Sequence, residues 1–141
     1  MRHVKPFYWL IVGLFLMATL AGCGGAATPV SCGVGTEGDP NTERFAANFT
    51  SIALAVKGGN AAITEAPANQ PLVLRLEGKG GLTVRICVLT QGGTVQRAFD
   101  QSVITVDGSN DYDIGTFGPG EYRLHLLDRN VLIGLINFSV K

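Results

Sequence analysis

The sequence predicts an all-β domain folded as an antiparallel sandwich or a small barrel. Val, Ile, Leu and Thr cluster in short runs whose apolar residues recur at every second position, which is typical of strands with one buried face. Segments rich in Gly, Asn and Asp separate these runs at intervals of roughly 8–12 residues, the spacing expected of a sandwich or barrel. No stretch shows the 3.6-residue periodicity of an amphipathic helix.

The first half of the domain contains two predicted strands and one stretch without an assignment. Val30–Val34 is predicted to be the first strand. Phe45–Lys57 is predicted to be the second, because its apolar residues alternate up to a Gly-Gly pair. The alanine-rich stretch that follows carries Pro67 and Pro71, and prolines argue against a helix through it.

The second half contains alternating runs joined by tight turns. Pro71–Glu77 and Leu82–Thr90 are separated by Gly-Lys-Gly-Gly, so they are predicted to pair as an antiparallel hairpin. The remaining runs are predicted to be a long or kinked strand, a short extended segment and a closing hairpin: Thr94–Val106, Tyr112–Phe117, and Glu121–Leu127 with Val131–Val140.

The N-terminus is organised like an export signal. Arg2 and Lys5 supply positive charge, and Phe7–Ala21 is almost wholly apolar. This apolar run is shorter than the ~20 residues that a membrane-spanning helix needs. We therefore expect residues 1–22 to form a signal helix that is removed on export. An uncleaved anchor helix and a plain secretory signal cut at another site are the alternatives.

The signal ends in Leu20-Ala21-Gly22-Cys23, which resembles the lipobox of bacterial lipoproteins. The resemblance implies cleavage before Cys23 and a diacylglycerol thioether on its sulfur, so the membrane itself is the expected partner. Two or more acyl chains make such an anchor stable. Residues 23–29 then form a short flexible tether. The domain is expected on the extracytoplasmic face of the cell membrane or the outer membrane.

Two motifs near the C-terminus resemble bacterial immunoglobulin-like or fibronectin-III-like domains. Phe117–Arg123 contains Pro-Gly-x-Tyr, which opens the penultimate strand of those domains, and Phe138-Ser139-Val140 matches the end of their last strand. The resemblance implies an antiparallel β-sandwich of about seven strands over residues 30–141. It also implies a role in adhesion, binding or scaffolding without an active site. Ala46–Asn69 does not fit that template.

Two cysteines remain once Cys23 carries lipid. Cys32 and Cys87 form an even pair in an oxidising compartment. A disulfide between them would close a long loop and stabilise the fold by ~4 kcal/mol; two free thiols are the alternative. The pair is not expected to be the inter-sheet disulfide of antibody domains, because the only tryptophan, Trp9, lies in the signal.

No catalytic, cofactor or metal site is predicted. Gly33–Gly38 matches G-x-G-x-x-G but runs into Asp39-Pro40, a turn where a dinucleotide site needs a helix. Asp107–Asp113 places oxygens at alternate positions but lacks the Gly and Glu of a calcium loop. His125 is the only histidine after the signal, and we expect it on a strand surface, without a second histidine or a nucleophile to work with.

Charge excludes one class of partner. The 11 basic and 11 acidic residues balance and form no basic stripe, so nucleic acid is not expected to bind. The sequence thus predicts a membrane-anchored extracytoplasmic lipoprotein that is not an enzyme and carries a single immunoglobulin-like binding or structural domain. Its further partner would be a protein or a glycan. The alternative is an accessory subunit of an envelope enzyme or transporter complex.

Overall fold

A computed structural model describes residue 32 and residues 38–79, 81–103 and 108–141. Within these residues the chain forms one short helix and eight strands, in the following order: α2 Thr42–Ala46, β1 Phe49–Val56, β2 Glu65–Ala66, β3 Leu72–Gly78, β4 Leu82–Thr90, β5 Val95–Val103, β6 Ser109–Gly115, β7 Gly120–Asp128 and β8 Val131–Val140. In this described part of the chain, no helix is long and apolar enough to cross a membrane.

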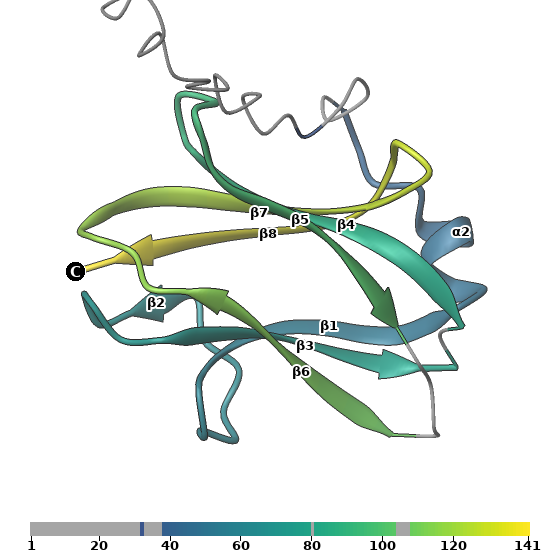
Figure 1. Ribbon diagram of the computed structural model, residues 1–141, viewed down its shortest axis with the longest axis horizontal. Coiled ribbons are helices and arrows are strands. Elements are labelled where there is room, and N and C mark those ends of the chain that lie inside the picture. The colour runs from purple at the N-terminus through teal and green to yellow at the C-terminus, as the bar shows by residue number, and fades with distance from the viewer. Residues whose placement is uncertain (1–31, 33–37, 80, 104–107) are drawn as a thin grey trace, which may run out of the picture.

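The strands form two layers that face each other across a single core (Figure 1). One sheet has the order β1-β3-β6, and the other has the order β2-β8-β7-β4-β5. Neighbouring strands are antiparallel except for the short pair β2 and β8, which run parallel. The chain changes sheet between β1 and β2, β2 and β3, β3 and β4, β5 and β6, and β6 and β7. These crossings give an immunoglobulin-like sandwich, so the predicted all-β fold class is confirmed.

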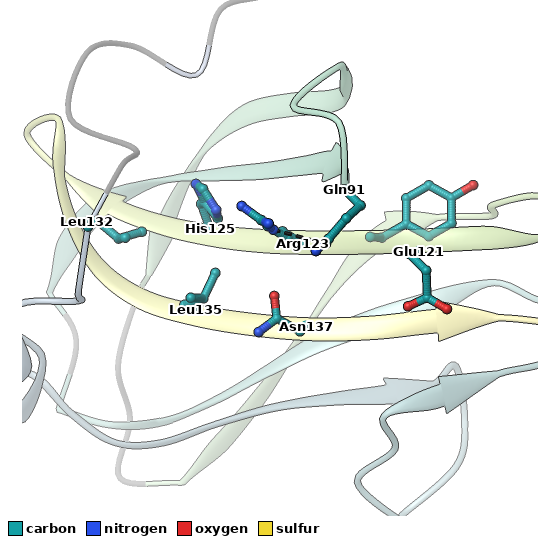
Figure 2. A pocket seen from close by; sticks show the side chains of 9 residues that line it. Gln91, Glu121, Arg123, His125, Leu132, Leu135 and Asn137 are labelled. Atoms are coloured by element: carbon teal, nitrogen blue, oxygen red, sulfur yellow. Dashed lines mark hydrogen bonds between the residues drawn. The ribbon is translucent and has the colours of Figure 1, made fainter.

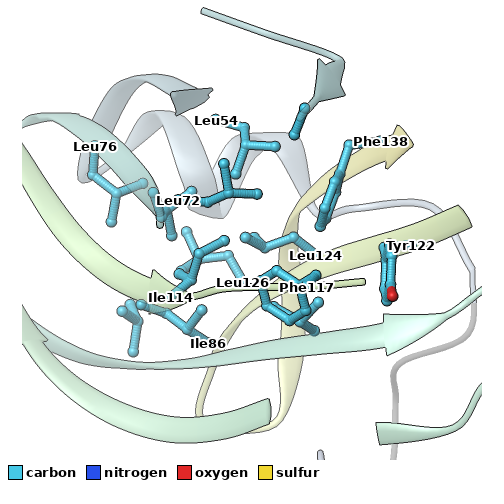
Figure 3. Packing of buried hydrophobic residues seen from close by; sticks show 14 of the residues in the cluster. Leu54, Leu72, Leu76, Ile86, Ile114, Phe117, Tyr122, Leu124, Leu126 and Phe138 are labelled. Atoms are coloured by element: carbon cyan, nitrogen blue, oxygen red, sulfur yellow. The ribbon is translucent and has the colours of Figure 1, made fainter. Parts of the chain in front are cut away.

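Alternation along the strands fills the core. Each inward face contributes branched aliphatic side chains, and the central ones are almost completely buried. Figure 3 shows members of this cluster from both layers. Those with the least exposure come from β1, β3, β4, β6, β7 and β8: Leu54, Leu72, Leu74, Leu76, Val84, Ile86, Val88, Ile114, Leu124, Leu126 and Ile133. Burial of this apolar surface is the main force that holds the sheets together.

The predicted pairing of β3 with β4 is wrong, although both strands were correctly predicted. They lie in opposite sheets and face each other through the core. Hydrogen bonds hold the two ends of the connection beside different sheets. The Lys79 amide donates at 2.9 Å to the carbonyl of Asn48, which precedes β1 of the smaller sheet. The Gly81 amide donates at 2.8 Å to the carbonyl of Val103, the last residue of β5 in the larger sheet. Two amphipathic strands bury their apolar faces equally well in a hairpin or across a sandwich, so alternation alone does not distinguish these arrangements.

The predicted strand Phe45–Lys57 is half right. Its first residues belong to α2, and the strand begins only at Phe49. The Asn41 side chain accepts a hydrogen bond from the Arg44 amide at 2.8 Å and so caps the helix. The ring of Phe45 packs against that of Phe49, with centroids 5.4 Å apart. The stretch that had no assignment supplies β2, whose Ala66 pairs with Val140 at the edge of the larger sheet.

The closing hairpin is confirmed, with a two-residue turn at Arg129 and Asn130. Both residues have positive φ, 48° and 65°, as a hairpin turn that matches the strand twist requires. Two other boundaries moved. The strand at Thr94–Val106 is described only up to Val103, and the extended segment at Tyr112–Phe117 begins earlier, at Ser109. Apart from Cys32, the first predicted strand lies outside the described residues, as do the predicted signal helix and tether.

The Pro-Gly-x-Tyr motif has a clear structural role. Tyr122 stands near the start of β7, and its hydroxyl donates to the Gly118 carbonyl at 2.8 Å. Its ring stacks on Phe138 at 5.4 Å between centroids. A tyrosine in this position, bonded back to the chain that leads into the strand, is a feature of immunoglobulin-like sandwiches.

Candidate functional site

The outer face of the larger sheet carries a row of polar side chains beside the apolar core. Because successive residues of a strand point to opposite faces, β7 sends Leu124 and Leu126 inward and Arg123 and His125 outward. On β8, Leu135 lies opposite His125 and Asn137 lies opposite Arg123. Figure 2 shows these four side chains together on β7 and β8, which are neighbouring strands of the larger sheet.

These side chains line a cavity of about 480 Å³ on the outside of the sandwich. Its walls come from β7 and β8, from the turn that follows β4, and from the chain before α2. The lining residues are Gly38, Gln91, Glu121, Tyr122, Arg123, His125, Leu132, Leu135 and Asn137. The cavity therefore combines hydrogen-bonding groups of several kinds with two leucines.

His125 lies on the outer face of its strand, as expected, but it is buried there instead of exposed to solvent. Only 6% of the residue is exposed, and its Nδ1 is sealed from solvent without a hydrogen-bond partner. In the sheet it stands between Cys87 of β4 and Leu135 of β8, neither of which offers a strong partner. Burial, with a smaller contribution from the positive charge of Arg123, lowers the pKa of His125 below its usual value. The ring is therefore neutral at neutral pH.

Arg123 is held in place by the turn after β4. Its Nε donates to the Gln91 side-chain oxygen at 3.1 Å. Gln91 is itself fixed, because its backbone N–H donates to the backbone carbonyl of Glu121 at 2.9 Å. These two bonds connect the end of β4 to the start of β7. They position a permanent positive charge inside the cavity.

A disulfide joins Cys32 to Cys87 next to this cavity, with their Cα atoms 5.8 Å apart. Both cysteines are buried in a second, smaller apolar cluster with Leu89 and Leu127. This cluster lies on the outer face of the larger sheet, since Cys87 and Leu89 are the neighbours of His125 and Arg123 in the β4–β7 register. The bridge is thus unlike that of antibody domains, which crosses the core between the two sheets. It holds Cys32 against this outer face, next to the position of His125 in the β4–β7 register.

The other residues considered from sequence do not join this site. Cys23 and Asp107 lie outside the described residues. Asp111 is paired with Arg75 through two bonds of 2.7 Å, which lower the pKa of Asp111. Asp113 is paired with Lys57 at 2.8 Å. Within the described ranges, no three His, Cys, Asp or Glu side chains are grouped as metal ligands.

Arg123, Asn137 and Gln91 are cavity residues that sequence reasoning missed. Alternation did carry a signal, because Glu121, Arg123 and His125 occupy every second position of an otherwise apolar strand. Polar residues at that spacing ordinarily mark a solvated face, so they do not by themselves indicate a pocket. Only the fold brings the turn at Gln91 over them.

Comparisons with known proteins give structural similarities alone. No family model matches the chain, and no curated protein matches its sequence. Among solved structures, an immunoglobulin-like protein from Pseudomonas aeruginosa is similar at 17% identity, over 67% of this chain and 94% of that one, with a TM-score of 0.48. A superoxide reductase (neelaredoxin) from Ignicoccus hospitalis is similar at 9% identity, over 75% of this chain and 90% of that one, with a TM-score of 0.40. The immunoglobulin-like assignment therefore rests on the strand order of this chain.

Proposed function

We propose that this protein is a lipid-anchored extracytoplasmic binding module. The observation that carries the proposal is Leu20-Ala21-Gly22-Cys23, placed directly after a basic and then apolar N-terminus. The disulfide between Cys32 and Cys87 supports it, because structural disulfides persist outside the cytoplasm. The immunoglobulin-like sandwich supplies a rigid frame, and the cavity at His125 and Arg123 supplies a surface that can hold a ligand.

Binding fits this cavity better than catalysis does. Nucleophilic catalysis by a hydroxyl, thiol or amine needs that group within hydrogen-bond reach of a base. Among the described residues that line the cavity, none is a serine, threonine, cysteine or lysine. The one hydroxyl, that of Tyr122, is already donated to the backbone of Gly118. The side chains that remain are suited to recognition through hydrogen bonds and charge.

The anchor is tested by replacing its lipid-bearing atom. Cells expressing the wild-type chain, Cys23→Ser and the control Cys32→Ser are labelled with a palmitate analogue, and their membranes are then separated. Cys32→Ser loses a thiol but keeps the lipobox. We expect label and membrane retention in the wild type and in Cys32→Ser. Cys23→Ser should carry no label and should run at the size of the uncleaved precursor, because the lipid precedes cleavage in this processing.

Two results would contradict the lipid anchor. A Cys23→Ser chain that is cut to the wild-type size would show a plain secretory signal. A wild-type chain that keeps residues 1–22 and resists extraction from the membrane without label would show an uncleaved anchor helix.

A further inference from the structure

The cavity beside His125 is lined by hydrogen-bond donors, and these indicate the class of ligand that it can bind. A neutral imidazole carries one N–H and one lone pair. Nδ1 is sealed and unpaired, and a buried N–H without an acceptor is rarer in proteins than a buried acceptor without a donor. The proton therefore belongs on Nε2. With Nδ1 sealed inside, Nε2 is the ring nitrogen by which His125 meets the cavity.

Arg123 and Asn137 add further donors beside this one. They face each other across the β7–β8 ladder, one step along from His125 and Leu135. The Nε of Arg123 is used by Gln91. No bond among the described residues uses its two terminal nitrogens, which leaves the Nη1 and Nη2 edge of the guanidinium free to donate two parallel hydrogen bonds to a carboxylate. The Asn137 side chain also has no hydrogen bond within the described part of the chain, so its amide is available.

The only acidic side chain of the lining is at the far end. Glu121 lies four residues before His125 on the same strand, roughly 13 Å away at the rise of an extended chain. Leu132 and Leu135 line the cavity near His125. Glu121 is only two residues from Arg123, about 7 Å along the strand, so Arg123 lies between this carboxylate and His125. An anion at the His125 end of the cavity is furthest from the repelling charge and has an apolar surface beside it.

We propose that this cavity binds a small organic carboxylate with an apolar substituent, held by the Arg123 guanidinium, the His125 Nε2–H and the Asn137 amide. The carboxylate accepts the charged bonds, and the substituent lies against Leu132 and Leu135. This inference rests on the proposed binding function and names the class of ligand. It does not depend on lipidation, since all of these residues lie in the β-sandwich.

The test is calorimetric titration of the purified full-length chain in detergent with three probes. N-acetyl-alanine carries a carboxylate with an apolar substituent, glucuronate carries one on a polar sugar ring, and N-acetyl-alaninamide lacks the charge. We expect N-acetyl-alanine to bind, and the amide to bind at least about tenfold more weakly because the charged bonds are lost. Glucuronate should bind more weakly than N-acetyl-alanine, since the leucines cannot pack against its hydroxyls.

Substitutions test which side chains bind the carboxylate. Arg123→Gln should weaken binding of N-acetyl-alanine by about tenfold or more, and Asn137→Asp should abolish it through charge repulsion. Arg129→Gln is the matched control, because it removes a guanidinium from the same hairpin but outside the cavity, where the side chain is 87% exposed. Circular dichroism verifies that each variant is folded.

The proposal is overturned if N-acetyl-alanine fails to bind to the folded wild type, or if the amide binds equally well. Tighter binding of glucuronate would overturn the apolar part of the proposal, and equal losses in Arg123→Gln and Arg129→Gln would overturn the site. Because Cys23→Ser should bind the acid as the wild type does, a failed anchor and a failed ligand site give different results.

Discussion

Loss of the Cys32–Cys87 bridge is expected to lower the free energy of unfolding by about 4 kcal/mol. The two cysteines are 55 residues apart. In the chain-entropy description, a cross-link over such a loop removes about 14 cal/mol/K from the entropy of the unfolded chain, which corresponds to about 4 kcal/mol at 25 °C. Because the total stability of a domain is commonly about 5–15 kcal/mol, this one bond accounts for a large fraction of it.

The assay is urea unfolding of oxidised and reduced protein in a Cys23→Ser background, which prevents disulfide exchange with the third cysteine. Far-UV circular dichroism is the appropriate signal, since the only tryptophan, Trp9, lies outside the described residues. With a urea dependence of about 1–3 kcal/mol per molar, the midpoint should fall by more than about 1 M on reduction. Cys32→Ala, Cys87→Ala and the double variant should lose similar amounts, because the same bond is removed in each. A reduced protein within about 1 kcal/mol of the oxidised one would refute the reasoning.

Four further substitutions test the fold and its pH dependence. Tyr122→Phe should cost about 1 kcal/mol in thermal unfolding, because it removes one hydrogen bond and keeps the stacked ring; unchanged stability would show that the bond contributes nothing. Gly78→Ala should cost more than about 2 kcal/mol, since φ is 144° and the new Cβ would lie 2.6 Å from the Cα of Phe49. Gly58→Ala, at φ 82° with open space around it, should cost less, and equal costs would contradict the clash. Finally, the lowered pKa of His125 means that the unfolded chain takes up its proton first, so stability should fall as pH drops from about 7 to 5. His125→Gln should flatten this slope in denaturant titrations, and a slope unchanged by the substitution would show that His125 is not its source.

The strands of this domain were largely predictable, because their periodicity is local. Leu82–Thr90 and Val131–Val140 were recognised from alternation and turn residues alone. Their partners were predicted only where a tight turn fixes them, as at Arg129 and Asn130. The short helix Thr42–Ala46 was missed because its stability comes from a cap and from contacts with the sandwich. Five residues are too few to show a helical pattern of apolar positions.

The pocket was not predictable, because it depends on distant parts of the chain. Gln91 reaches Arg123 only after β4 and β7 have paired. His125 pairs with Cys87 of β4, whose disulfide partner is 55 residues away in sequence. A histidine between leucines on an outer strand face is ordinarily predicted to be solvated. Sequence patterns predict the face of the strand on which a residue lies. Whether that face is exposed to solvent depends on tertiary contacts.

The position of Cys87 also determines how mechanical force enters the domain. β4 is paired on both sides, with β7 and with β5. In a chain held at its N-terminus, tension passes from Cys32 through the disulfide directly into this interior strand, and the segment between the two cysteines carries none of it. β1 and β3 are therefore shielded from peeling, and extraction of β4 requires two ladders to break together. Reduction of this bond would route the tension through β1 and β3 as well.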